Sequence, residues 1–167
     1  MNAESNLITE GFVVTFRFFS LDKSREAIEM NCSFSLHPEF GDWTIASASS
    51  FYTYDDLMLL AEYFEGHIAS FGKLENSYRF LLYQKRFTLQ AYSGYKTEDD
   101  QGSFTFEFMV NAGEKTPQEP DVFVGGMATV AVAEVKRFIL SLKAVALHLQ
   151  QELRKSNLDS DSHLPDE

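Results

Sequence analysis

The stretch that decides the fold is residues 130–154, VAVAEVKRFILSLKAVALHLQQELR. Its apolar residues recur at steps of three and four, the spacing of one face of an α-helix. These residues are Val135, Phe138, Ile139, Leu142, Val145, Ala146, Leu149 and Leu153. The other face carries Lys136, Arg137, Lys143, Gln150 and Glu152. The stretch therefore predicts a long helix of about six turns that lies on an apolar layer.

The layer beneath this helix is expected to be a β-sheet, because apolar and polar residues alternate in the preceding sequence. A first hairpin is expected from two alternating stretches, which run from Phe12 to Phe18 and from Ile28 to Leu36. A short strand is expected at Trp43 and Ile45. Four further strands are expected at residues 78–83, 87–92, 104–110 and 122–130, the last with a bulge at Gly125 and Gly126. Residues 1–10 are expected to be a loose lead-in.

A shorter helix is expected between the third and fourth strands. Thr53 and Asp56 have the spacing of a capping box, and Leu57, Leu60 and Phe64 continue as an apolar stripe. Hairpin-connected strands with two separate helices are typical of α+β domains. The prediction is a strongly twisted, mainly antiparallel sheet of six to seven strands packed on two helices, the long one C-terminal. Residues 1–155 would form this single domain, and residues 156–167 a polar, flexible tail.

The composition limits the possible functions. The net charge is −11, and 44% of the residues are hydrophobic, which indicates an acidic globular protein. An acidic surface repels nucleic-acid backbones and anionic membranes, so we expect neither as a partner. The first ten residues do not resemble a secretory signal, and no apolar run reaches the length of a membrane span. We therefore expect a cytoplasmic protein.

The sequence contains no recognisable catalytic or metal-binding motif. Cys32 is the single cysteine and lies at an inward strand position, so we expect a buried, inert thiol. The four histidines lack metal-ligand spacing, and no P-loop or nucleophile elbow occurs. We therefore predict no enzymatic activity, no catalytic residue, no metal and no cofactor.

Tyrosines and an acidic loop form the candidate partner-binding surface. Tyrosine is favoured at binding hot spots, and a carboxylate-rich loop suits a basic protein partner. The alternative is that the tyrosines only complete the rim of the core and that the loop is a solvated hairpin tip. The candidate residues are Tyr52, Tyr54, Tyr83, Tyr92, Tyr95, Glu98, Asp99 and Asp100.

The layout resembles small bacterial immunity proteins of the WapI type. The resemblance rests on Trp43, Ile45, Asp56, Leu57 and Phe64, on the run Gly102-Ser103-Phe104-Thr105-Phe106, and on Val135, Phe138, Ile139 and Leu142. It implies a cytosolic protein that neutralises a toxin by binding it, and it carries over no functional residue.

The leading functional hypothesis is therefore a non-enzymatic protein-binding module, an immunity-type antagonist with a protein partner. Three alternatives remain at this stage. The protein could be an acidic inhibitor that mimics nucleic acid, a small-ligand-binding domain with a pocket inside a curled sheet, or a subunit of a homodimer.

Overall fold

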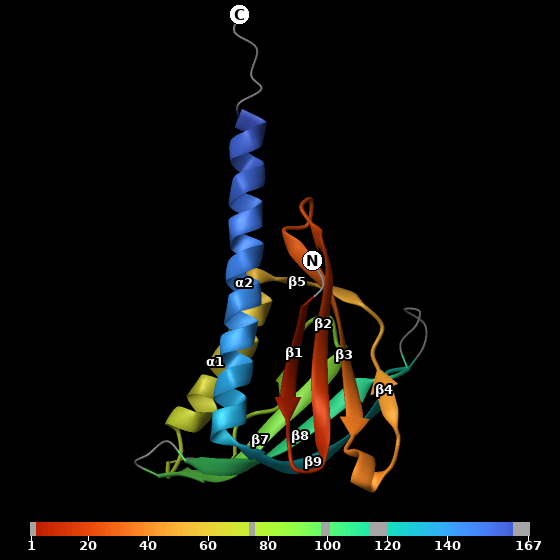
Figure 1. Ribbon diagram of the computed structural model, residues 1–167, viewed down its shortest axis with the longest axis vertical. Helices are drawn as coiled ribbons and strands as arrows, with labels where there is room; N and C mark the ends of the chain where they lie inside the picture. The colour runs from red at the N-terminus through yellow and green to blue at the C-terminus, as the bar shows by residue number, and fades with distance from the viewer. Residues whose placement is uncertain (1–2, 74–75, 98–100, 114–119, 162–167) are drawn as a thin grey trace, which may run out of the picture.

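The computed structural model describes residues 3–73, 76–97, 101–113 and 120–161, with side chains through residue 155. The described residues form two α-helices and nine strands in two antiparallel sheets of five and four strands. The elements are β1 (Ala3–Ile8), β2 (Phe12–Asp22), β3 (Ala27–Leu36), the 3₁₀ turn η1 (Pro38–Phe40), β4 (Thr44–Ala46), β5 (Ser50–Thr53), α1 (Tyr54–Ala69), β6 (Phe80–Leu81), β7 (Phe87–Lys96), β8 (Gly102–Asn111), β9 (Phe123–Ala131) and α2 (Val132–Asp161). This arrangement confirms the α+β class, but the strands divide into two sheets where a single sheet was expected (Figure 1).

The five-stranded sheet, sheet A, is built around the expected β2–β3 hairpin. β1 pairs with β2 on one side, and β4 and β5 both pair with β3 on the other. The expectation of a loose lead-in is wrong, because β1 pairs with β2 along its whole length, from Ala3 opposite Phe18 to Ile8 opposite Val13. The alternation in β1 is hard to see because one of its buried positions is Ser5, whose Oγ lies 2.6 Å from Ser141 Oγ of α2.

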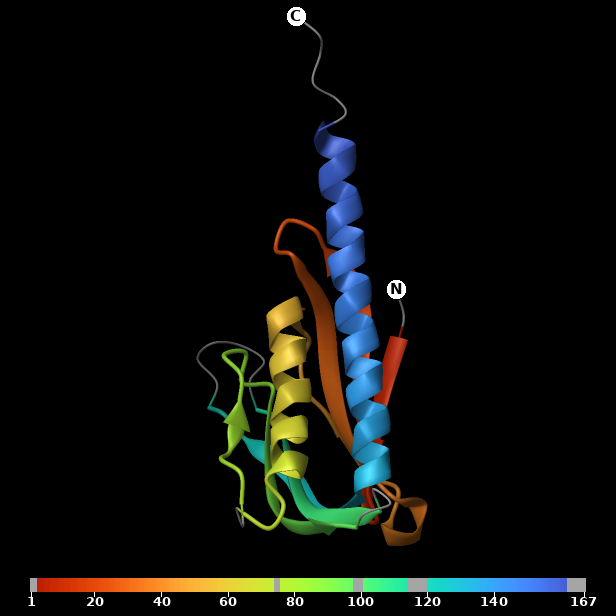
Figure 2. The same cartoon turned by 90° about the vertical axis from the view of Figure 1, so that its left-hand side faces the viewer.

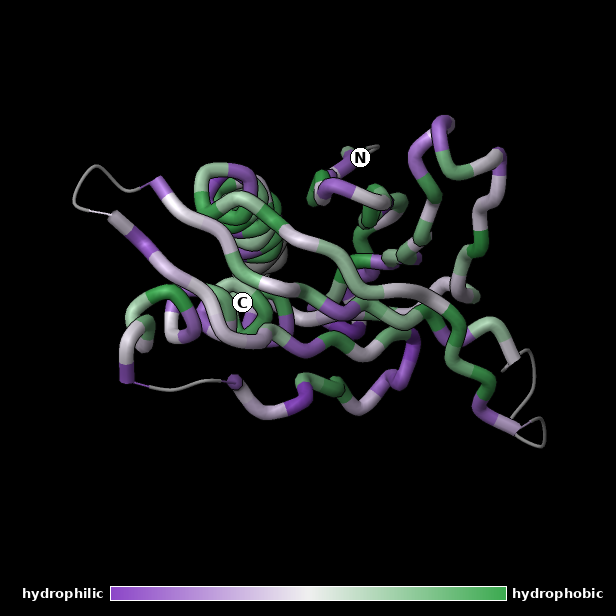
Figure 3. The backbone as a smooth tube through the Cα atoms, turned by 90° about the horizontal axis from the view of Figure 1, so that it is seen from below, coloured by the Kyte–Doolittle hydropathy of each residue, from purple (hydrophilic) through white to green (hydrophobic). Residues whose placement is uncertain are grey.

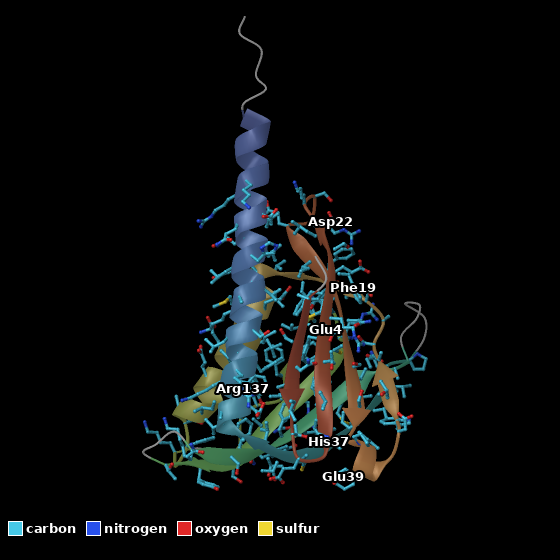
Figure 4. All side chains as sticks on the ribbon, in the orientation of Figure 1. Glu4, Phe19, Asp22, His37, Glu39 and Arg137 are labelled. Atoms are coloured by element: carbon cyan, nitrogen blue, oxygen red, sulfur yellow. The ribbon has the colours of Figure 1, made fainter. Side chains whose placement is uncertain are left out.

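Short-range contacts fix both ends of sheet A. Figure 4 shows Asp22 at one end of the β2–β3 hairpin and His37 at the other. The Asp22 carboxylate accepts hydrogen bonds from Ser24, and these bonds lower the pKa of Asp22. The His37 Nε2 lies 2.7 Å from the Thr9 carbonyl oxygen. At the same end of the sheet, the Trp43 ring packs against the Phe34 ring, with 5.8 Å between ring centroids.

The four-stranded sheet, sheet B, has the order β6-β7-β8-β9 and runs across the lower end of sheet A (Figure 1). The bulge expected at Gly125 and Gly126 is wrong, because β8 and β9 pair without a break from Ser103 opposite Ala131 to Asn111 opposite Phe123. The irregularity in this sheet lies instead in β7, between Ala91 and Gly94. Gly125 permits a close approach of the two strands, because a Cβ there would lie 1.9 Å from the Phe108 carbonyl oxygen.

The two helices lie side by side against the sheets (Figure 2). α1 begins at the predicted capping box, in which Thr53 Oγ1 accepts from the Asp56 amide and the Asp56 carboxylate accepts from the Thr53 amide. The apolar stripe of α2 is buried from Val135 to Leu149, as predicted. The backbone of α2 continues past residue 155, where the domain was expected to end, and its last turns extend beyond the sheets (Figure 1). Residues 162–167 lie outside the described part of the chain.

Phenylalanine rings fill the space where both sheets and both helices meet. The ring centroids of Phe16 of β2 and Phe87 of β7 are 5.2 Å apart, and those of Phe64 of α1 and Phe106 of β8 are 5.6 Å apart. Phe138 of α2 contacts both Phe16 and Phe64. The two sheets are therefore joined mainly through side chains, and both helices lie on one side of sheet B (Figure 2).

Candidate interaction surface

One side of sheet B is covered by neither helix. Phe104, Phe106 and Phe108 are buried, so they lie on the core side of β8. Because side chains alternate along a strand, Thr105 and Glu107 lie on the opposite side. Seen from below, the strands of sheet B run in front of both helices (Figure 3). Part of this side of sheet B therefore faces the surroundings, whereas Thr88 and Asn111 on the same side are buried.

The strand register brings residues from three strands together on this face. Gln90 of β7 pairs with Glu107 of β8, and Glu107 pairs with Met127 of β9. Tyr95 pairs with Ser103, which by alternation lies on the same side as Glu107. The Tyr92 hydroxyl and the Arg79 guanidinium both contact the Glu107 carboxylate. We call this surface the open face, and its residues are Arg79, Gln90, Tyr92, Tyr95, Glu107 and Met127.

Glu107 is the centre of the polar contacts on the open face. The Arg79 Nη2 lies 2.8 Å from one Glu107 oxygen, and the Tyr92 hydroxyl donates to the other at 3.4 Å. The same hydroxyl is 3.3 Å from Gln90 Oε1. Partial burial and the negative charge of Glu107 raise the pKa of Tyr92. The network fixes the orientation of Arg79 and Tyr92, whereas an exposed ion pair contributes only about 0–1 kcal/mol to stability.

The chemistry of the open face suits recognition of another protein. Tyr95 is 62% exposed and Met127 is 55% exposed, so both present apolar area to solvent. Tyrosine, methionine and arginine are residue types enriched in protein interfaces. Tyr92 and Arg79 are held by Glu107 before any partner binds, which reduces the side-chain entropy lost on binding. The surface therefore combines apolar contact area with oriented hydrogen-bonding groups.

The structure brings two of the predicted tyrosines, Tyr92 and Tyr95, to the open face. Tyr52 cannot contribute to any surface, and this part of the prediction is corrected. Tyr52 lies opposite Ile28 in the β3–β5 ladder and is only 1% exposed, because β5 adds to sheet A with this side chain inward. Its sequence context, Phe51-Tyr52-Thr53, gave no clear alternation from which the inward face could be inferred.

The remaining predicted residues do not join the open face. Tyr54 is half-buried at the first turn of α1, and Tyr83 is 96% exposed in the turn between β6 and β7. Gln84 of that turn donates to the Phe51 carbonyl oxygen, so the turn adjoins the start of α1 and lies at the opposite end of β7 from Tyr95. The predicted loop Glu98, Asp99 and Asp100 lies outside the described residues.

Sequence reasoning missed Gln90, Glu107 and Met127 as surface contacts. Gln90 and Glu107 could have been found, because both occupy outward positions in clearly alternating strands. Met127 was harder to find, because the expected bulge at Gly125 and Gly126 would have placed its side chain on the opposite face of the sheet. The uninterrupted pairing of β8 with β9 places Met127 opposite Glu107.

Within the described ranges, no group of three or more histidine, cysteine, aspartate and glutamate side chains is arranged to hold a metal ion. Burial raises the pKa of the Cys32 thiol to about 12, which agrees with the expected inert thiol. His67 is buried against Phe104 with its Nδ1 2.8 Å from Ser77 Oγ. Neither described helix has an apolar length that could cross a lipid bilayer.

No family model matches the chain, and no curated protein matches it.

Proposed function

We propose that this chain is a non-enzymatic protein-binding module that acts in the cytoplasm and holds its partner on the open face. The observation that supports the proposal is the position of Tyr92, Tyr95 and Met127 around the Arg79–Glu107 pair, on a sheet face that neither helix covers. Exposed aromatic and thioether groups supply the apolar area that is buried in a complex. The oriented polar groups fix the orientation of the partner on this surface.

The partner is expected to be more basic than this chain. A net charge of −11 attracts a basic protein over long range and increases the rate of productive encounter. Within this class we propose an immunity-type antagonist, which neutralises a toxin by occupying it. A toxin encoded directly upstream would be the first candidate to test.

The test measures the affinity of a purified candidate toxin for variants of this chain at moderate salt. Tyr95→Ala and Met127→Ala remove exposed contact groups of the open face and are expected to lower the affinity by about tenfold or more each. Raising the salt concentration is expected to slow association and to leave the dissociation rate nearly unchanged, because long-range attraction is screened.

Tyr83→Ala is the matched control, because Tyr83 is an even more exposed tyrosine that lies away from the open face. It is expected to change the affinity by less than about twofold. Equal losses for Tyr83→Ala and Tyr95→Ala would contradict the proposed site. A partner that duplex DNA displaces would instead indicate mimicry of nucleic acid.

A further inference from the structure

A buried hydroxyl group of α1 contacts both segments that carry the polar residues of the open face. The Tyr63 side chain is only 5% exposed. Its hydroxyl donates to the Tyr78 carbonyl oxygen at 2.9 Å and accepts from the Ala91 amide at 2.9 Å. Arg79 directly follows Tyr78, and Tyr92 directly follows Ala91. One buried group is therefore bonded to the residue before each of these two open-face residues.

This hydroxyl lies where the strand pairing of sheet B is interrupted. β6 pairs with β7 with Phe80 opposite Leu89, and the same register would place Tyr78 opposite Ala91. At that point the Tyr63 hydroxyl is bonded to the backbone of both residues. The Tyr63 ring packs against the rings of Tyr78 and Phe80, with centroid distances of 5.3 and 5.2 Å. The spacing between Tyr78 and Ala91 therefore depends on a side chain of the helix.

β7 contains a bulge directly after the amide that donates to Tyr63. Two residues of β7, Tyr92 and Ser93, lie opposite the single residue Thr105 of β8. A bulge of this kind interrupts the ladder and changes the direction of a side chain. The Tyr92 hydroxyl contacts Glu107 from this bulge. Because the ladder does not fix a bulged residue, the bond to Tyr63 just before the bulge limits how far Tyr92 can move.

The segment that carries Arg79 is held by the same helix. This segment leads into β6 and lies beside α1 (Figure 2). Ser77 Oγ lies 2.8 Å from the Nδ1 of His67, which follows Tyr63 by one helical turn. From this segment, the Arg79 guanidinium extends across β7 to Glu107 of β8. Two neighbouring side chains of α1 therefore limit the movement of Arg79.

Arg79 and Tyr92 come from separate segments and meet at Glu107, so their contacts depend on the spacing of those segments. We propose that the Tyr63 hydroxyl is a positioning group, which sets this spacing and thereby orients Arg79 and Tyr92 for the partner. The inference rests on the proposed function for the partner, whereas the positioning can be measured on the isolated protein. Groups that are already oriented lose less entropy on binding. Removal of the hydroxyl therefore lowers the affinity although Tyr63 itself is buried.

The first experiment measures the rotation rate of the Arg79 guanidinium group about its Cζ–Nε bond, by NMR of the isotope-labelled full chain at neutral pH. The contact with Glu107 slows this rotation, and Arg79→Lys identifies the signal. Tyr63→Phe keeps the buried ring, and circular dichroism checks its fold. It is expected to increase the rotation rate by about fivefold.

A double variant shows whether Tyr63 acts through Glu107. Glu107→Gln removes the charge of the acceptor and is expected to speed the rotation of Arg79 by itself. In the Glu107→Gln background, Tyr63→Phe is expected to change the rate by less than about twofold, because the contact that depends on the hydroxyl is already weakened. Independent effects of the two changes would contradict the proposal.

Ser5→Ala is the matched control. It also removes a buried hydroxyl, but that hydroxyl joins β1 to Ser141 of α2, away from the open face. Ser5→Ala is expected to change the rotation rate of Arg79 by less than about twofold, even if it lowers stability as much as Tyr63→Phe. A further measurement needs no variant. Hydrogen exchange of the Ala91 amide in the unchanged protein is expected to be slow, because this amide donates to a buried hydroxyl.

The second experiment measures the affinity of the candidate toxin for the same variants. Tyr63→Phe is expected to lower the affinity by about fivefold, and Ser5→Ala by less than about twofold. Full affinity of Tyr63→Phe for a toxin that requires Tyr95 would overturn the positioning proposal alone. An unchanged rotation rate in Tyr63→Phe, an equal increase in Ser5→Ala, or rapid exchange of the Ala91 amide would also overturn it. A faster rotation in Tyr63→Phe, together with a toxin that does not need Tyr95, would support the positioning and contradict the proposed function.

Discussion

The ring of Phe16 on β2 lies 5.4 Å from the ring of Phe138 on α2, measured between centroids, and both side chains are buried. Phe138 also meets Phe64 of α1 at 5.9 Å. One ring of the long helix therefore contacts sheet A and the other helix together, which makes it a sensitive position for testing the architecture.

Phe138→Ala is expected to lower the free energy of unfolding by about 3–5 kcal/mol, because it leaves a cavity where three elements meet. Urea denaturation followed by circular dichroism measures this change. Leu140→Ala on the same helix is the control and is expected to change it by no more than about 0.5 kcal/mol, because Leu140 is exposed. Similar losses for the two variants would mean that α2 does not pack as described.

The Tyr63 hydroxyl links α1 to sheet B. It donates to the Tyr78 carbonyl oxygen at 2.9 Å and accepts from the Ala91 amide at 2.9 Å. Tyr63→Phe leaves that buried amide without its acceptor, so we expect a loss of about 1–3 kcal/mol in the free energy of unfolding. Tyr92→Phe, which removes only the longer hydrogen bonds of the open face, is expected to cost less. The reverse order would contradict this assignment.

Burial lowers the pKa of His67 below its usual value of 6.5. The unfolded chain therefore takes up the proton first as the pH falls, so the contribution of the neutral imidazole to stability is present above pH 6.5 and is lost below it. We expect the urea concentration at the midpoint of unfolding to decrease as the pH is lowered from about 7.5 to about 5.5.

His67→Gln is expected to flatten this pH dependence, and His148→Gln, at an exposed position of α2, to leave it unchanged. The urea midpoints of the unchanged protein and of both variants are measured side by side at each pH. An unchanged slope in His67→Gln would show that another group is responsible.

Cys32 is expected to be unreactive in the folded protein. Its thiol is fully buried, and burial raises its pKa to about 12, so almost no thiolate exists near pH 8. A colourimetric thiol reagent at about pH 8 is expected to detect the single thiol only after denaturant is added. Rapid reaction without denaturant would mean that the β3 region opens readily.

The periodic patterns predicted the elements whose inward positions are all apolar. β2, β3, β8 and α2 are of this kind, and the Thr53–Asp56 capping box located the start of α1. β1 was missed because one of its inward residues is serine. The division into two sheets could not be predicted, because hydrogen-bond partners distant in sequence decide it and alternation does not identify them.

The candidate surface was predicted only in part. Tyr92 was expected at an outward strand position and Tyr95 beyond the end of that strand, but β7 extends to Lys96 and includes both. Met127 required the register between β8 and β9. Tyr52 was misplaced because a four-residue strand gives too little alternation to identify its inward face. Tyr83 was correctly expected to be exposed, but its distance from Tyr95 depends on the direction of β7.

Trp43 is the single tryptophan of the chain, and its indole stands against Phe34 at the margin of sheet A. It lies outside the open face. Its fluorescence is therefore expected to change when the domain unfolds and to stay constant when the open face is occupied. Intrinsic emission thus provides a signal for denaturation, and an added label will be needed to follow association.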